Sequence, residues 1–298
     1  RYAFAMRRTF PIIFSILFAS VLLVACAPEG EARLIRGSSS SASSAHSAQS
    51  RRAERLAEAA SRPTSSALAV VKGTPQATYR VPVLVYHHVR AQQDWAKTTW
   101  SWKMTVTPET FERHMQWLVD KGYTTMTLDE LTAAIHGDVV MPEKPVVITF
   151  DDNNLSQYNV AAPIMDAKLQ KGVFFLIAKY LDSPTMVNRE RALDLQARGH
   201  QIASHTMTHR ALPGLNDADT KWELEESKRV FEELTGKTVK DVSYPGTAHN
   251  QRVRDTAKAA GYETATIMDP RYVTETDDWM KWPRIMMTDD TDLAKVLP

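Results

Sequence analysis

From Val81 onward, short apolar runs rich in β-branched residues alternate with longer segments whose apolar residues recur at helical spacing. The apolar runs predict eight strands, at residues 81–86, 124–127, 146–150, 173–177, 201–204, 241–244, 264–267 and 284–287. The segments between them predict helices, two of which have distinct apolar stripes: Phe111, Met115, Leu118 and Val119 after Pro108, and Trp222, Leu224, Val230, Phe231 and Leu234 before Gly236. Eight strands that alternate with helices over about 215 residues fit an α/β fold, a distorted or incomplete (β/α) barrel.

The beginning of the chain has the features of a secretion signal. Arg7 and Arg8 precede an apolar run at residues 10–24, which ends at the small residue Ala25. The run has about fifteen residues, whereas a membrane-spanning helix needs about twenty. Cys26, the only cysteine, follows directly and resembles the lipidated cysteine of a bacterial lipobox. We therefore predict a lipoprotein signal peptide at residues 1–26, and a mature chain anchored to a membrane through lipidated Cys26 at its periplasmic or extracellular face.

Composition separates a linker from a folded domain. Residues 27–78 are rich in Ser, Ala and Arg, and such a segment lacks the apolar side chains that would offset its ordering entropy. We predict a disordered linker there and one folded domain at residues 79–298. The net charge of the whole chain is +1, which gives no electrostatic footprint for nucleic acid.

Reactive side chains follow the predicted strands. Asp151 and Asp152 come directly after one strand. Adjacent carboxylates repel each other unless positive charge lies beside them, so they indicate a divalent cation, although a turn or a helix cap also uses such a pair. His205 and His209 follow another strand, and histidines four residues apart lie on one face of a helical turn. Two histidines and one carboxylate are a common ligand set for catalytic Zn²⁺.

Two further segments differ in what they indicate. Pro245 and Gly246, after Tyr244, predict a tight turn whose backbone N–H groups point into the site, although an ordinary turn has the same composition. Charges alternate in sign along the helical segment from Glu223 to Arg229, which indicates a solvent-exposed face.

Four motifs stand in order between residues 80 and 290. They are Pro82-Val83-Leu84-Val85-Tyr86-His87-His88, Thr149-Phe150-Asp151-Asp152, His205-Thr206-Met207-Thr208-His209 and Tyr244-Pro245-Gly246. In this order they resemble the polysaccharide deacetylases of carbohydrate esterase family 4, which share the NodB-homology domain. The first and last motifs are similar to those of the branch that acts on exopolysaccharides and biofilm poly-N-acetylglucosamine.

The resemblance implies a metal-dependent hydrolase that removes N-acetyl groups from an N-acetylglucosamine-containing polysaccharide, such as a biofilm exopolysaccharide, peptidoglycan or a chitin-like polymer. Asp152, His205 and His209 would hold the metal, for which Zn²⁺ is expected and Ni²⁺ or Co²⁺ are alternatives. Asp151 would be the general base, and the backbone N–H of Gly246 would stabilise the oxyanion. The side chains expected to bind the sugar are His88 (with His87 as the alternative), Tyr244, Pro245, Trp282 and Arg284.

The chain departs from the family pattern. Asn153 replaces the Gly that usually follows the Asp pair, and Ser243 stands in the region of the usual third-motif Arg. The fourth motif, in which an Asp orients the base and a Trp walls the pocket, is expected to be replaced by a segment with Asp277 or Asp278, Trp279 or Trp282, and Arg284. No Leu-x-His motif near the C-terminus supplies a general acid, and a structural role is the preferred interpretation of the other candidate, His249.

Two alternatives therefore stay open. An acetylxylan-type O-deacetylase is one, because the family includes enzymes of that kind. A non-catalytic, carbohydrate-binding surface lipoprotein is the other, because the acid motif is missing.

Overall fold

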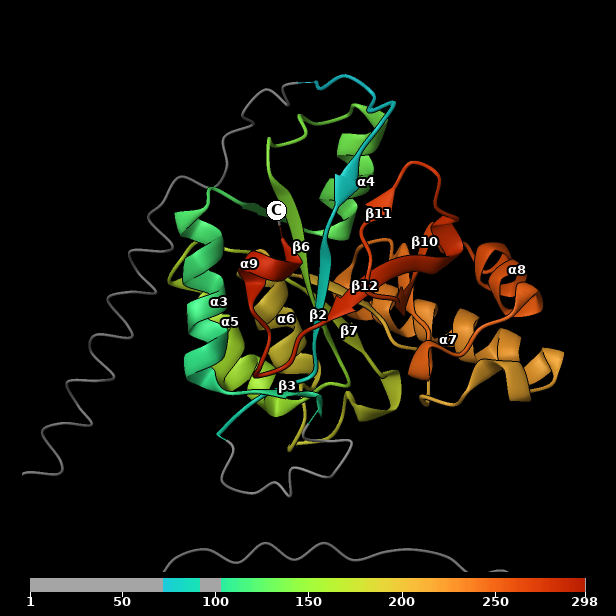
Figure 1. Ribbon diagram of the computed structural model, residues 1–298. Helices are drawn as coiled ribbons and strands as arrows, with labels where there is room; N and C mark the ends of the chain where they lie inside the picture. Colours follow the sequence, from blue (N-terminus) through green and yellow to red (C-terminus); the bar gives the residue numbers. More distant parts are fainter. Residues whose placement is uncertain (1–71, 92–102, 298) are drawn as a thin grey trace, which may run out of the picture. The chain divides into compact units, whose positions relative to one another are not determined.

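The computed structural model describes residues 72–91 and 103–297 (Figure 1). The predicted signal peptide, Cys26 and most of the predicted linker lie outside these ranges. Within the described ranges, no helix combines the length and the apolar character that crossing a bilayer requires.

Short strands and helices alternate along the described chain. The strands are β1 (Arg80–Val81), β2 (Val83–Tyr86), β3 (His88–Val89), β4 (Thr105–Val106), β5 (Thr124–Met126), β6 (Pro145–Asp151), β7 (Val173–Leu176), β8 (Gln201–Ser204), β9 (Asp241–Ser243), β10 (Thr264–Met268), β11 (Val273–Thr274) and β12 (Trp282–Met286). The α-helices are α3 (Pro108–Asp120), α4 (Leu128–His136), α5 (Ala162–Asp166), α6 (Arg189–Ala197), α7 (Asp217–Thr235), α8 (Gln251–Ala259) and α9 (Leu293–Val296). A π-helical turn lies at Gln157–Ala161, and 3₁₀ turns lie at Ala178–Tyr180, Leu212–Gly214, Pro245–Thr247 and Trp279–Lys281.

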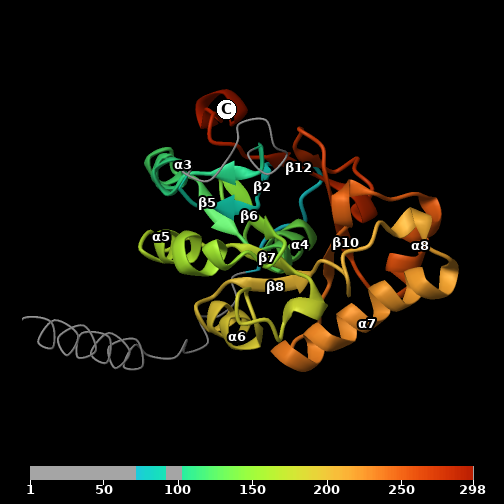
Figure 2. The ribbon, with the colours of Figure 1, turned by 90° about the horizontal axis from the view of Figure 1, so that it is seen from below.

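Seven parallel strands close into a barrel in the order β2, β12, β10, β9, β8, β7, β6 and back to β2. The eighth predicted strand, β5, is outside this ring and pairs with the beginning of β6, where Thr124 lies opposite Pro145. Helices α3, α5, α6, α7 and α8 surround the strands (Figure 2). The predicted (β/α) barrel is therefore confirmed.

Local sequence signals set the helix ends. Thr107 accepts a hydrogen bond from the backbone N–H of Thr110 and begins α3, and Thr127 and Glu130 form a reciprocal capping box at α4. Gly236 ends α7 with a φ of 65°, a left-handed conformation that glycine adopts without steric cost. Each N-cap contributes about 1 kcal/mol to stability.

The two predicted apolar stripes are mostly buried, with one exception in each. Phe111, Met115 and Leu118 are fully buried, but Val119 is 44% exposed. On α7, Trp222 is 46% exposed. Val119 and Trp222 lie at the edges of their stripes, where the helix turns its side chains toward solvent.

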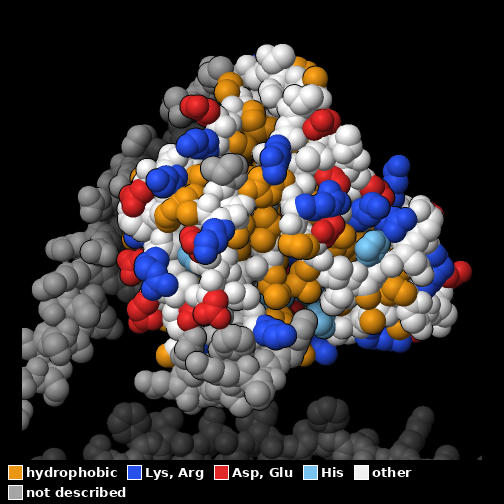
Figure 3. Space-filling view, viewed as in Figure 1, with side chains coloured by type: hydrophobic (Ala, Val, Ile, Leu, Met, Phe, Trp, Pro, Cys, Tyr) orange, Lys and Arg blue, Asp and Glu red, His pale blue; other side chains and the backbone are white. Residues whose placement is uncertain are grey.

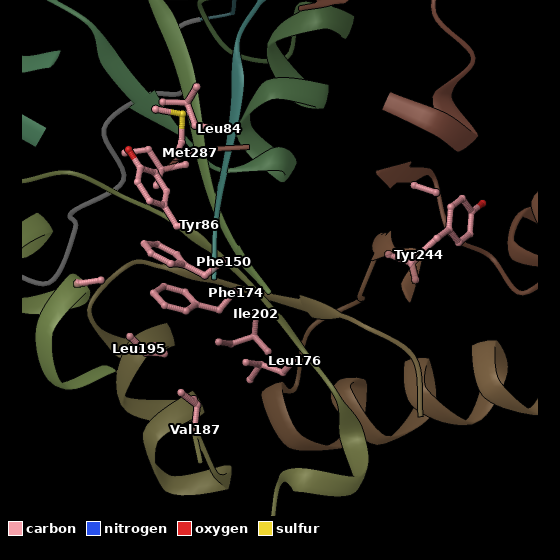
Figure 4. Close-up of a cluster of buried hydrophobic side chains, with 14 of the residues drawn as sticks. Leu84, Tyr86, Phe150, Phe174, Leu176, Val187, Leu195, Ile202, Tyr244 and Met287 are labelled. Atoms are coloured by element: carbon pink, nitrogen blue, oxygen red, sulfur yellow. The ribbon is translucent and has the colours of Figure 1, made fainter. Parts of the chain in front are cut away.

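Successive side chains of the strands point alternately to two cores. On β6, Ile148 and Phe150 belong to the cluster between barrel and helices, whereas Val147 belongs to the cluster inside the barrel. In the outer cluster, the rings of Phe150 and Phe174 stack at a centroid distance of 4.7 Å (Figure 4). The next inward positions after Val147 are polar, Thr149 and then Asp151. The barrel interior therefore becomes polar toward the carboxyl ends of its strands, where barrel enzymes carry their chemistry.

Candidate metal centre and active site

Three side chains from two loops meet at the carboxyl end of the barrel. Asp152 follows β6, and His205 and His209 follow β8. The Oδ1 atom of Asp152 lies 3.3 Å from the Nε2 atom of His205 and 3.3 Å from the Nε2 atom of His209. One potential ligand atom from each residue lies within 4.8 Å of the others, and this is the one group of that kind among the described residues. The prediction that these two distant segments meet is confirmed.

The spacing fits a metal of tetrahedral preference. Ligand atoms about 2.0–2.1 Å from Zn²⁺ at tetrahedral angles lie about 3.3–3.4 Å from one another. The Nδ1 atom of His205 lies 2.8 Å from the carbonyl oxygen of Ser243, to which it donates, so its Nε2 atom keeps a free lone pair for a cation. Burial raises the pKa of the Asp152 carboxyl, but its interactions with His205 and His209 outweigh it and hold that pKa well below its usual range. The carboxylate is therefore ionised, as a metal ligand must be.

The segment that carries the two histidines is not the helical turn that their spacing predicted. Residues 205–211 have no helix, and Thr206 and His209 have φ values of 64° and 65°. Left-handed backbone costs a non-glycine residue about 1–2 kcal/mol, so tertiary contacts must hold this loop. The two rings still converge, with centroids 4.7 Å apart.

Asp151 is held by a buried guanidinium rather than by a metal. Arg284 donates from its two terminal nitrogens to the two carboxylate oxygens of Asp151, at 2.7 Å each, and both side chains are almost fully buried. The same guanidinium donates to Ser243 Oγ at 2.8 Å, and Ser243 Oγ donates to Asp151 Oδ2 at 3.1 Å. These residues come from β6, β9 and β12, which are not neighbours in the ring, so their side chains meet inside the barrel.

This arrangement fixes both the charge and the orientation of Asp151. Burial raises the pKa of its carboxyl, but the charge of Arg284 outweighs burial and lowers that pKa to about 2. Oδ2 accepts two hydrogen bonds, whereas Oδ1 accepts one, from Arg284. Oδ1 therefore keeps a lone pair for a water molecule or a substrate. The Oδ2 atom lies 3.9 Å from Nε2 of His205, which places this carboxylate directly beside the three-residue site.

Asn153 adopts the positive φ that a glycine would allow, and its side chain adds two hydrogen bonds. Its φ is 54°, a conformation that asparagine tolerates better than most residues. Its buried side-chain amide donates to the carbonyl oxygen of Val187 and accepts from the backbone N–H of Ile177. It thus ties the loop after β6 to the loop after β7, which explains the departure from glycine.

Of the two adjacent histidines, His87 is the more deeply buried. Burial lowers the pKa of His87, and the charges of Asp151 and Asp152 oppose that shift. The side-chain amide of Gln157, in the π-helical turn, donates to the backbone carbonyls of both His87 and Asp151 and so joins the two strand ends. His88 is half-buried, and burial, followed by the charge of Arg90, lowers its pKa. The choice between His88 and His87 as the side chain that faces the site stays a prediction.

The structure also corrects the predicted sugar contacts. Tyr244 and Trp282 are 1% and 0% exposed, and Pro245 and Arg284 are buried as well. Strand alternation directs Trp282 and Arg284 into the barrel, with Trp282 at the beginning of β12. Arg284, and not an Asp, orients Asp151, and these four side chains offer no surface to a polymer.

The turn after β9 has the predicted position. Gly246 is exposed in the 3₁₀ turn Pro245–Thr247 with a φ of 58°. His249 stacks on Tyr244 with nearly parallel rings, and its Nδ1 atom lies 2.9 Å from the carbonyl oxygen of Thr247. These contacts agree with a structural role for His249.

Sequence reasoning missed one acidic residue. Glu223 begins the charged stretch that predicted a solvent-exposed face, yet its exposure is 0%. Its carboxylate accepts hydrogen bonds from the backbone N–H and the hydroxyl of Thr208. Charge alternation indicates the outer face of a helix, but the register of α7 turns Glu223 inward, and only the packed structure shows this.

The fold and the site define a class: a parallel (β/α) barrel with a two-histidine, one-carboxylate site at the carboxyl ends of its strands. Residues 138–265 match the family model described as polysaccharide deacetylase. Over these residues the chain is similar to the polysaccharide deacetylases, as the resemblance of its motifs implied.

Named relatives agree with this assignment. YxkH of Bacillus subtilis (strain 168), whose name assigns it provisionally to the polysaccharide deacetylases, is 29% identical over 191 residues, which cover 64% of this chain and 65% of that protein. Poly-β-1,6-N-acetyl-D-glucosamine N-deacetylase of Escherichia coli (strain K12) is 31% identical over 119 residues, which cover 35% of this chain and 18% of that enzyme. The chain thus spans less than two thirds of the length of either relative. The crystal structure of BC0361, a polysaccharide deacetylase from Bacillus cereus, aligns with a TM-score of 0.65 at 26% identity, over 74% of this chain and 70% of that one.

Proposed function

We propose that this chain is a metal-dependent hydrolase that removes N-acetyl groups from an N-acetylglucosamine-containing polysaccharide. The observation that carries the proposal is the convergence of both Nε2 atoms on Asp152 Oδ1, with the Asp151 carboxylate beside them. The name of the Escherichia coli relative, which acts on poly-β-1,6-N-acetyl-D-glucosamine, supports the amide substrate.

Asp152, His205 and His209 would hold the cation, for which Zn²⁺ is our first choice and Ni²⁺ or Co²⁺ are alternatives. When bound, such a cation lowers the pKa of water and polarises the acetyl carbonyl. Asp151 accepts the proton of the attacking water at Oδ1, where its free lone pair lies. Because a carboxylate with a pKa of about 2 is a weak base, this proton transfer depends on prior acidification of the water.

The leaving amine needs a proton, and we propose the imidazolium form of His87 as its source, a form that the charges of Asp151 and Asp152 favour against burial. His87 is buried beside both carboxylates, and no hydrogen bond occupies its Nδ1 atom within the described part of the chain. His249, the other candidate, is held by Tyr244 and Thr247. The backbone N–H of Gly246 remains our candidate for stabilising the oxyanion, because the turn that carries it follows β9 at the same end of the barrel.

The proposed subcellular location rests on the N-terminal sequence alone. The signal-like run and Cys26 support a lipid-anchored protein at a periplasmic or extracellular surface, where a polysaccharide substrate is accessible.

Acetate release tests the proposal. The purified chain is assayed on N-acetylglucosamine oligomers and on acetylated xylan, before and after treatment with a chelator and with Zn²⁺ added back. Asp152→Asn and His209→Gln should abolish release, whereas His136→Gln, an exposed histidine on α4, should leave it unchanged. Release from xylan alone would favour O-deacetylation, and sugar binding without any release would favour the non-catalytic alternative.

A further inference from the structure

The loop that carries both histidine ligands needs external support. Thr206 and His209 hold left-handed backbone, with φ values of 64° and 65°. Thr206 is β-branched, and β-branched residues are rarely found in this conformation. The position of both imidazoles therefore depends on the contacts that hold residues 205–209 in place.

Helix α7 supplies much of that support through one residue. The backbone carbonyl of Glu223 accepts from the N–H of Met207 at 3.1 Å. Its carboxylate accepts from the N–H of Thr208 at 2.8 Å and also from the Thr208 hydroxyl. Glu223 thus holds Met207 and Thr208, two of the three residues that stand between His205 and His209 in the chain.

The carboxylate is unusual in its surroundings. Glu223 is fully buried, and no cationic side chain of residues 72–91 or 103–297 forms an ion pair with it. Its neighbours on the solvent side of α7 differ, since Glu225 pairs with Lys221 and Glu226 pairs with Arg229. A buried carboxylate without a cationic partner is costly unless its hydrogen bonds, or a nearby positive charge, compensate.

We infer that Glu223 is a positioning residue of the metal site. It fixes Thr208, and through Thr208 the separation of the two histidines, so that both Nε2 atoms fall at 3.3 Å from Asp152 Oδ1. The inference rests on the proposed metal site and adds to it a residue that touches neither metal nor substrate.

Cation binding to the full chain tests this. The affinity for Zn²⁺ is measured by competition with a chelator, and the visible absorption spectrum of the Co²⁺-loaded chain reports coordination geometry. We expect Glu223→Ala to weaken Zn²⁺ binding about 10- to 100-fold and to alter the Co²⁺ spectrum, as loss of such supporting partners does. Glu223→Gln keeps one acceptor for Thr208 and should lose less. Glu225→Ala, on the exposed side of the same helix, is the matched control and should bind as wild type does.

A folded Glu223→Ala variant with wild-type affinity and an unchanged Co²⁺ spectrum would overturn the inference. If that variant does not fold, Thr208→Val removes the hydroxyl donor while keeping the shape of the side chain. Thr208→Val should weaken Zn²⁺ binding, and wild-type binding by Thr208→Val would equally overturn the inference. If the wild-type chain itself takes up no cation, the proposed function fails. If the wild-type chain takes up Zn²⁺ and the variants bind it equally well, only the inference about Glu223 fails.

Discussion

Replacing Arg284 with Met removes the guanidinium that holds Asp151. Arg284 donates to Thr149 Oγ1, to both oxygens of Asp151 and to Ser243 Oγ, and its side chain is 2% exposed. Met is apolar and of similar length, so the variant leaves the Asp151 carboxylate buried without its counter-charge. Breaking a buried ion pair on one side costs about 3–5 kcal/mol. Because burial then acts unopposed, the pKa of Asp151 should rise from about 2 to above its ordinary value.

The free energy of unfolding is measured by urea denaturation, followed by tryptophan fluorescence, in a chelating buffer that excludes stabilisation by bound metal. We expect Arg284→Met to lose about 3–5 kcal/mol and Asp151→Asn to be destabilised as well. The double variant should lose less than the two single losses combined, with a coupling free energy of about 2 kcal/mol. Arg229→Met, which breaks exposed pairs with Glu226 and Glu233, should change stability by less than about 1 kcal/mol.

Arg284→Lys separates charge from geometry. Lysine keeps a positive charge but cannot bond both carboxylate oxygens in a fixed plane, so stability should be partly restored. Acetate release should stay about 100-fold below wild type, because the base is no longer oriented. Additive losses in the double-variant cycle, or full activity of Arg284→Met, would show that the pair does not hold the base.

Three other buried side chains, Asp241, His87 and Asn153, lead to predictions of their own. Asp241 is fully buried, and burial, followed by the charge of Asp129, raises its pKa to about 7 from 3.8. The folded chain therefore keeps this proton up to about pH 7, and the free energy of unfolding should fall by about 4 kcal/mol as pH rises from 4 to 8. In urea denaturation, Asp241→Asn should flatten this dependence of the unfolding free energy on pH. An unchanged dependence would contradict the raised pKa of Asp241. His87→Ala should abolish acetate release from N-acetylglucosamine oligomers but keep release from an aryl acetate, whose leaving group needs no proton, and equal losses on both substrates would argue against a proton donor. Asn153→Gly should relieve the strain of the positive φ, yet it should lower the free energy of unfolding by about 1–3 kcal/mol, because the Ile177 N–H loses its acceptor. Unchanged stability would show that the hydrogen bonds of Asn153 are unimportant.

Figure 3 shows why the surface gives little help in locating the site. On the face shown, apolar side chains gather in the middle and most acidic and basic side chains lie around them, with histidine visible only in small patches. The residues that matter most, Asp151 and Arg284, are hidden in the barrel. On this face, the charge pattern therefore says less about the location of the site than the order of the strands in the barrel does.

The sequence by itself determined the barrel and the place of the site. Buried strands have a pattern that is local in the chain, so the eight strands of the main sheet could be predicted, whereas the two-residue strands β1, β3, β4 and β11 were missed. Because parallel strands end at one edge, the sequence alone leads one to expect that Asp152, His205 and His209 meet.

Only the tertiary structure decided which distant side chains support them. Arg284 reaches Asp151 across 133 positions of the chain, and no local pattern records that two non-adjacent strands direct their side chains to one point. The inward turn of Glu223 and the burial of Trp282 have the same origin. Each depends on the register in which the ring closes, which is a long-range packing outcome and leaves no mark in local periodicity.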